Sequence, residues 1–155
     1  TGINLRMGTI LNQTVPDFYD FYLGGLIGLK SYPFYSISGI HIAAMNLFYR
    51  FPIFKNIDKS LATLYLDKIF GGIYFDYGYA WNGKTTTKTF DKFVKGVGGE
   101  LRFKLHSYYM FPTALFFNAA YGLDKYEKYI ETTKTTVSYG KELQFYFGIL
   151  FDFAF

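Results

Sequence analysis

The two histidines are the side chains with the clearest capacity for catalysis, because an enzymatic nucleophile needs a positioned base. His106 falls on the polar face of an alternating segment, and the adjacent Ser107 must point to the opposite face of a strand. His41 falls on an apolar face, beside Ala43. This spacing gives no set of Ser, His and acid, so we expect no catalytic residue and no enzyme activity.

Four aspartates, Asp20, Asp76, Asp124 and Asp152, are the candidates for holding a cation. Their spacing matches no EF-hand loop. The chain has no Cys, which excludes disulfides and thiolate metal sites. We therefore expect no metal and no cofactor. The net charge of +4 is mild and the lysines are scattered, so we expect no nucleic-acid partner either.

The composition suggests the kind of element that carries these residues. Half of the residues are hydrophobic and 23% are aromatic, yet the mean hydropathy is only +0.08, so apolar and polar residues are interleaved. The alternating wall of a membrane β-barrel has this composition, and so has a Phe-rich soluble β-sandwich. No run approaches the roughly 18 apolar residues of a membrane-spanning helix. The chain begins at Thr1 without a signal peptide, which indicates a processed or truncated product.

Alternation with a period of two residues predicts about seven strands. The predicted ranges are 3–11, 18–23, 40–51, 69–81, 97–109, about 115–123 and 142–155. Between the second and third lies a Gly-rich loop, residues 24–39. Pro52 is expected to end the third strand, and Phe111-Pro112 is expected to form a tight turn. Residues 54–68, 82–92 and 125–141 are expected to be connections.

The last predicted strand has the most regular pattern. Every second residue from Leu143 to Phe155 is apolar, which indicates one face against an apolar solvent or core. The strands of about 10 to 14 residues suit tilted membrane spans better than soluble sheets. Short turns alternate with long polar loops, as in outer-membrane barrels. A soluble sandwich remains the alternative.

Three motifs in order resemble one family. Leu23-Gly24-Gly25, then residues 29–32 (Leu-Lys-Ser-Tyr) and 36–39 (Ser-Ile-Ser-Gly), resemble the Leu-Gly-Gly, Val-Arg-Gly-Tyr and Ser-Gly pattern of the BamA/TamA/FhaC superfamily. These are bacterial outer-membrane assembly factors and two-partner secretion transporters, also called bacterial surface antigens. Residues 47–52 resemble the family's Glu-Tyr-Arg-Phe-Pro strand, and residues 75–81 its Phe-Asp-x-Gly-x-x-Trp strand. Phe151, Phe153 and Phe155 are similar to the C-terminal sorting signal of such barrels.

The resemblance implies an all-β, antiparallel transmembrane barrel in the bacterial outer membrane. Residues 1–155 would form its C-terminal part, about the last seven of sixteen strands, with the motif loop at 24–39 and the closing strand at 142–155. Five strands are expected after the loop, as in the family.

The resemblance also implies a lumen loop motif, Leu29, Lys30, Ser31 and Tyr32, with Asp76 as its partner on the barrel wall. Lys30 replaces the family's Arg, which removes a bidentate grip on a carboxylate. Phe48 replaces its Glu, which removes one acidic partner. We predict a contact between Lys30 and Asp76, at salt-bridge distance or weaker. The alternative is a solvated loop lysine.

Two functions stay open. The first, implied by the resemblance, is outer-membrane protein insertion or polypeptide translocation, in which a client strand pairs with an exposed barrel edge. Its partners would be outer-membrane lipid, unfolded β-barrel clients and periplasmic accessory proteins. The second is a passive porin or a structural surface antigen.

Overall fold

A computed structural model describes residues 1–11, 16–107, 111–130 and 134–151. Its main element is an antiparallel sheet in which successive long strands are neighbours. The order is β1 (Gly2–Thr9), β4 (His41–Phe54), β6 (Leu64–Trp81), β7 (Val94–Ser107), β8 (Phe111–Gly122) and β11 (Leu143–Phe151), while β5 (Lys59–Leu61) pairs with β6. This arrangement confirms the all-β, antiparallel prediction.

Two short strand pairs lie apart from the main sheet. They are β2 (Phe21–Leu23) with β3 (Ile37–Gly39), and β9 (Tyr126–Ile130) with β10 (Thr135–Tyr139). The helical segments in the described ranges are a 3-10 turn, η1 (Asp17–Tyr19), and one turn of helix, α1 (Thr87–Phe90). No helix among the described residues has the length and apolar character needed to cross a bilayer.

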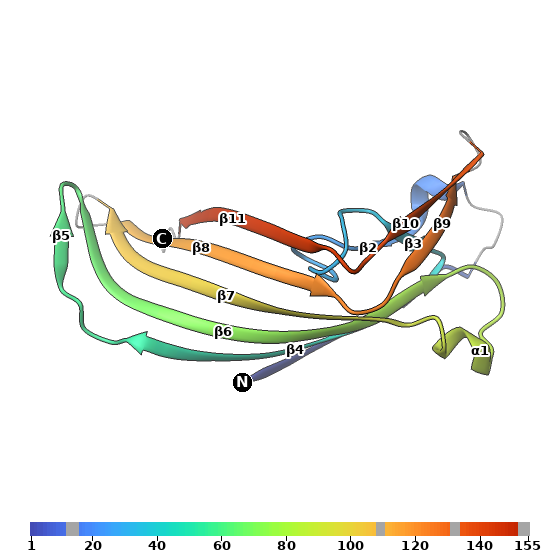
Figure 1. Cartoon of the computed structure of the whole chain (residues 1–155), viewed down its shortest axis with the longest axis horizontal. Helices are drawn as coiled ribbons and strands as arrows, with labels where there is room; N and C mark the ends of the chain where they lie inside the picture. The colour runs from blue at the N-terminus through green and yellow to red at the C-terminus, as the bar shows by residue number, and fades with distance from the viewer. Residues whose placement is uncertain (12–15, 108–110, 131–133, 152–155) are drawn as a thin grey trace.

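The long strands bow together, and the β2–β3 pair lies on the concave side (Figure 1). We call the two faces of this sheet the inner, concave face and the outer, convex face. Register fixes which side chains share the inner face, because every second residue points the same way. One row across the inner face is Asn46, Asp76, Gly96 and Gly122; a parallel row is Arg50, Gly72, Glu100, Asn118 and Tyr146.

The outer face is largely apolar and exposed. Ile3, Ile73 and Phe147 are 68%, 60% and 71% exposed, far more than core side chains would be. The remaining exposed members of this face include Leu5, Met7, Tyr49, Val97, Leu101, Phe117, Tyr121, Leu143, Phe145, Ile149 and Phe151. A contiguous apolar surface of this extent needs a cover in the folded protein.

The sheet is open within the described residues. β1 pairs with β4 on one side, β11 pairs with β8 on one side, and the two are not neighbours. The long strands after residue 39 are β4, β6, β7, β8 and β11, the five that the sequence predicts.

Only the second half of the strand predicted at 18–23 is formed. Residues 17–19 form η1 instead, and only Phe21–Leu23 is extended. This segment pairs with β3 rather than with a neighbour in the main sheet. Six residues of alternation between Pro16 and the paired glycines Gly24-Gly25 are too few to determine a long strand, so the local turn prevails.

Strand ends also differ from the sequence prediction. β4 continues through Pro52 to Phe54, and a register shift between these residues accommodates the missing N–H. Phe111 and Pro112 belong to β8 instead of a turn; residues 108–110 lie outside the described residues. Within the predicted connections 54–68 and 125–141, residues 59–61 pair with 64–66 and residues 126–130 pair with 135–139, so both contain paired strands. The closing strand is described to Phe151, so Phe153 and Phe155 lie outside the described residues.

Candidate functional site

Residues 24–36, which we call the inner loop, connect β2 to β3 and fold back onto the inner face. The β2–β3 pair brings the two ends of the loop together, with Leu23 opposite Ile37. Gly24 and Gly25 have φ of +103° and +78°, a left-handed conformation that favours glycine. The N–H of Gly25 donates to the Tyr32 carbonyl at 2.8 Å and closes the loop on itself. The loop is therefore a compact unit.

Apolar side chains anchor the loop to the sheet. Leu29, Tyr32 and Ile37 are completely buried, and they belong to a cluster with Leu23, Ile42, Ala44, Ala80 and Val94. Burial of a large apolar side chain stabilises by about 1.5–3 kcal/mol, so this cluster contributes the main driving force for seating the loop.

Tyr32 also carries polar contacts at the far end of the loop. Its hydroxyl lies 2.8 Å from the Asp124 carbonyl and 3.1 Å from the Lys95 carbonyl, and it can donate to one of them at a time. Burial raises the pKa of Tyr32 to about 12, with a weaker, opposing effect from the backbone at Asp124. The neutral phenol is therefore the form that fits the seated loop.

Asp76 holds the middle of the loop. Its side chain is completely buried in β6. One carboxylate oxygen accepts the backbone N–H of Lys30 at 2.9 Å, and the other accepts the side-chain amide of Asn46 at 2.9 Å. The same Asn46 amide nitrogen donates to the Gly28 carbonyl at 3.2 Å. A carboxylate with charge-assisted hydrogen bonds on both oxygens is a strong anchor for a loop backbone.

Lys30 contacts Asp76, but through its backbone rather than its ammonium. The ammonium nitrogen lies 3.9 Å from the centre of the Tyr74 ring, a cation–π arrangement. Among the described residues Lys30 takes part in no ion pair. The salt bridge implied by the resemblance is therefore replaced by a backbone hydrogen bond. The Lys30 carbonyl accepts a hydrogen bond from the Tyr146 hydroxyl at 2.9 Å. Asp76 of β6 and Tyr146 of β11 therefore both hydrogen-bond to the backbone of Lys30.

Ser31 can pack closely against the sheet because the residue below it, Gly96, has no side chain. A Cβ placed on Gly96 would overlap the Ser31 hydroxyl. The Ser31 and Ser36 hydroxyls are buried and have no hydrogen-bond partner among the described residues. The contact therefore depends on close approach of loop and backbone rather than on a polar bond.

A charged cluster lies beside the loop on the row of Glu100. The carboxylate of Glu100 receives Arg50 Nε at 3.0 Å on one oxygen and an Arg102 terminal nitrogen at 3.3 Å on the other. The side-chain amide of Asn118 donates to the second oxygen at 3.4 Å. The Glu100 side chain is only 9% exposed, so these three partners compensate most of its desolvation.

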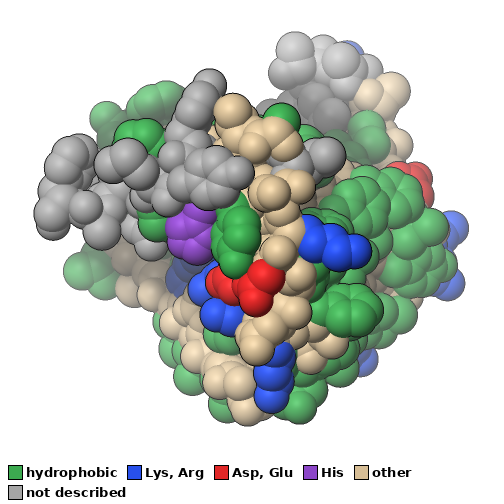
Figure 2. Space-filling model, turned by 90° about the vertical axis from the view of Figure 1, so that its left-hand side faces the viewer, with side chains coloured by type: hydrophobic (Ala, Val, Ile, Leu, Met, Phe, Trp, Pro, Cys, Tyr) green, Lys and Arg blue, Asp and Glu red, His purple; other side chains and the backbone are tan. Residues whose placement is uncertain are grey.

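The other candidate residues lie away from this site. His41 lies on the outer face, where its Nδ1 is 2.6 Å from the Thr9 hydroxyl. His106 of β7 is paired with Pro112 of β8, and its ring lies beside the Tyr65 ring. Viewed from the β5 end, charged and histidine side chains gather in the middle, with hydrophobic side chains around them (Figure 2). No group of three metal-ligating side chains comes together in the part of the chain that the structure describes.

The sequence identified Asp76 as a partner of the loop but did not indicate that Asn46 and Tyr74 also contact it. It also missed Tyr146, which is 116 residues from Lys30 in the chain. The alternation of apolar and polar residues shows which side chains of one strand share a face. The register between strands decides which residues of that face meet across the sheet. The glycine at position 96, unusual in the interior of a strand, is the signal that could have indicated a close approach.

Comparison with protein-family models, with curated proteins and with solved structures gives no match.

Proposed function

We propose that this chain is the C-terminal part of an outer-membrane β-barrel of the BamA/TamA/FhaC kind, which inserts or translocates polypeptides. One observation supports the proposal above the others: an open antiparallel sheet carries an exposed apolar outer face and a motif loop fixed on its inner face. The three family-like motifs lie together in this arrangement, at the inner loop, at Arg50 on β4 and at Asp76 on β6.

Lipid is the proposed cover of the outer face. β4, β6, β7 and β8 contain 14, 18, 14 and 12 residues, and a tilted transmembrane strand needs about 9–11. The inner face carries charged residues and buried hydrogen bonds, as a wet barrel interior does. A second sheet could cover the outer face instead, and that would make a soluble sandwich.

The edge of β11 supports the assembly function. An edge strand offers unpaired backbone groups to another chain, and β-augmentation by a client strand uses those groups. In the proposed barrel, β1 continues to preceding strands and β11 is the closing strand. Client entry would occur where β11 meets the first strand of the barrel.

A passive barrel is the second candidate, and the firm seating of the inner loop favours it. The loop occupies part of the inner face, where its apolar side chains are buried and its backbone at Lys30 is bonded to the Asp76 carboxylate and the Tyr146 hydroxyl. A loop so held would constrict a pore without moving. The presence of periplasmic docking domains in the full-length protein would favour assembly over this alternative.

The test is depletion of the full-length protein in the bacterium that carries it, followed by measurement of outer-membrane protein levels. Assembly predicts a general fall of β-barrel proteins in the outer membrane. Unchanged levels, with altered permeability to small solutes, would overturn assembly and favour the passive barrel. Electrophoresis of unheated and heated protein tests the barrel itself, because a folded barrel migrates differently before heating.

A further inference from the structure

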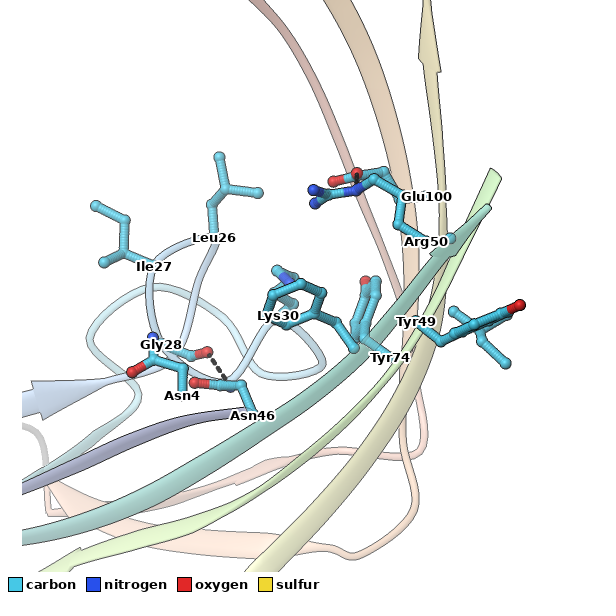
Figure 3. A pocket seen from close by; sticks show the side chains of 13 residues that line it. Asn4, Leu26, Ile27, Gly28, Lys30, Asn46, Tyr49, Arg50, Tyr74 and Glu100 are labelled. Atoms are coloured by element: carbon cyan, nitrogen blue, oxygen red, sulfur yellow. Dashed lines mark hydrogen bonds and ion pairs between the residues drawn. The ribbon is translucent and has the colours of Figure 1, made fainter. Parts of the chain in front are cut away.

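A cavity of about 200 Å³ separates the inner loop from the charged cluster. Leu26, Ile27 and Lys30 line it from the loop, whereas Arg50, Tyr74 and Glu100 line it from the sheet (Figure 3). A single water needs only about 10–15 Å³ of such space, so a small polyatomic ligand fits.

Two cations face this cavity with unused hydrogen-bond donors. The ammonium of Lys30 rests on the Tyr74 ring and has no hydrogen-bond acceptor among the described residues. Arg50 reaches Glu100 through Nε alone, which leaves its two terminal nitrogens without a described partner. A guanidinium has five donor hydrogens in a planar fork, and this fork suits carboxylate and phosphate oxygens.

The local charge balance is positive. Lys30, Arg50 and Arg102 carry three positive charges, while Glu100 and Asp76 carry two negative charges. Glu100 is already shared between the two arginines. Asp76 directs its oxygens to a backbone N–H and to the Asn46 amide. Glu100 lines the cavity, but its two oxygens already accept from Arg50, Arg102 and Asn118, so an anion would meet the open donors of the two cations.

We propose that this cavity binds a small oxyanion, a phosphate or a carboxylate group, between the Lys30 ammonium and the Arg50 guanidinium. Tyr74 supports Lys30 from below, and Glu100 orients Arg50 by holding its Nε. The site depends on the inner loop and the sheet, and it goes beyond the proposed function without resting on it. A soluble protein with the same loop would bind the same anion.

Binding would couple the anion to the position of the loop. Lys30 belongs to the loop and Arg50 to the sheet, so only the seated loop completes the site. A ligand that binds one state alone stabilises it by the factor 1 + [L]/Kd. At a concentration ten times Kd, the released state of the loop should become about tenfold rarer.

The first experiment is calorimetric titration of the full-length protein with inorganic phosphate and, separately, with acetate at constant ionic strength. We expect saturable binding that weakens at least tenfold in Lys30→Gln and in Arg50→Gln. Lys104→Gln is the matched control, because Lys104 also lies over an aromatic ring, Phe70, but does not line the cavity. Absence of binding, or equal binding in all variants, would overturn the proposal.

The second experiment follows tryptic cleavage after Lys30, which requires release of the loop. Phosphate should slow this cleavage in the wild-type protein and in Lys104→Gln, relative to chloride of equal ionic strength, but not in Arg50→Gln. Equal protection in Arg50→Gln would overturn the site. A soluble short-chain phosphatidic acid is then tested as a competitor of inorganic phosphate for the site. Competition would identify a lipid headgroup as the source of the phosphate, and lack of competition would identify a free ion. Both results support the site. If Lys30→Gln fails to fold, Arg50→Gln alone still decides.

Discussion

Replacing Asp76 with Ala should release the inner loop. The substitution removes acceptors from the Lys30 N–H and from the Asn46 amide, each bonded at 2.9 Å in a buried setting. Of these two bonds, only the Lys30 bond joins the loop to the sheet, and a hydrogen bond to a charged group contributes about 1.5–3 kcal/mol, so the seated loop loses about that much. Since 1.4 kcal/mol is a factor of ten, the released population should rise by roughly 10- to 100-fold.

Trypsin measures that population, because cleavage after Lys30 needs the released loop. In the regime where opening is faster than cleavage, the rate follows the equilibrium population. We therefore expect Asp76→Ala to be cut roughly 10- to 100-fold faster than the wild-type protein, with the overall fold retained by circular dichroism.

Asp124→Asn is the matched control. The Asp124 carboxylate also accepts a backbone N–H, from Lys95 at 3.0 Å, and the substitution keeps the Asp124 backbone carbonyl that receives the Tyr32 hydroxyl. This control should be cleaved at nearly the wild-type rate. If Asp76→Ala is cleaved within threefold of wild type, the carboxylate does not hold the loop, and the reasoning from its buried hydrogen bonds is refuted.

Four further predictions test the loop and the outer face. Gly96→Ala should accelerate tryptic cleavage in the loop as strongly as loss of the carboxylate, because its Cβ overlaps Ser31; a wild-type rate would contradict the close approach. Tyr146→Phe removes one neutral hydrogen bond to a loop carbonyl, of about 1 kcal/mol, and should accelerate cleavage about fivefold. The folded-state pKa of Tyr32 is raised from 10.0 to about 12, so its stabilisation of the seated loop is complete below pH 10 and is lost as pH rises through about 12. Cleavage of the loop by a base-stable protease should measure this loss, and the pH dependence should be absent in Tyr32→Phe. Phe147→Arg on the outer face should destabilise a lipid-embedded protein by about 2–4 kcal/mol in urea titrations, whereas a side chain 71% exposed to water would tolerate the change.

The resemblance motifs were informative about position but not about contact. They placed Lys30 and Asp76 as partners, and the two residues do meet. The sequence could not show that the contact uses the backbone N–H, since that depends on where the loop peptide comes to rest. The ring of Tyr74 takes the ammonium instead, because it lies beside Asp76 on the same face of β6.

Strand ends were the least predictable feature of the fold. Pro52 was expected to end its strand, but a register shift lets β4 continue beside β6. The hairpins β5–β6 and β9–β10 were expected to be connections, because charged and other polar residues interrupt the alternation there. Pairing with a neighbour, rather than hydropathy, extends these segments.

The sequence by itself determined the sheet and its two faces, because an alternating pattern is a local property of each strand. It indicated the apolar outer face, the charged inner face and the position of the motif loop between residues 24 and 39. Tertiary structure alone decided what the loop contacts. Asn46, Tyr74 and Tyr146 converge on it from three strands, and Lys30 and Arg50 share a cavity only through the register of β4 and the fold of the loop. Such contacts join residues far apart in the chain, and no local pattern contains that information.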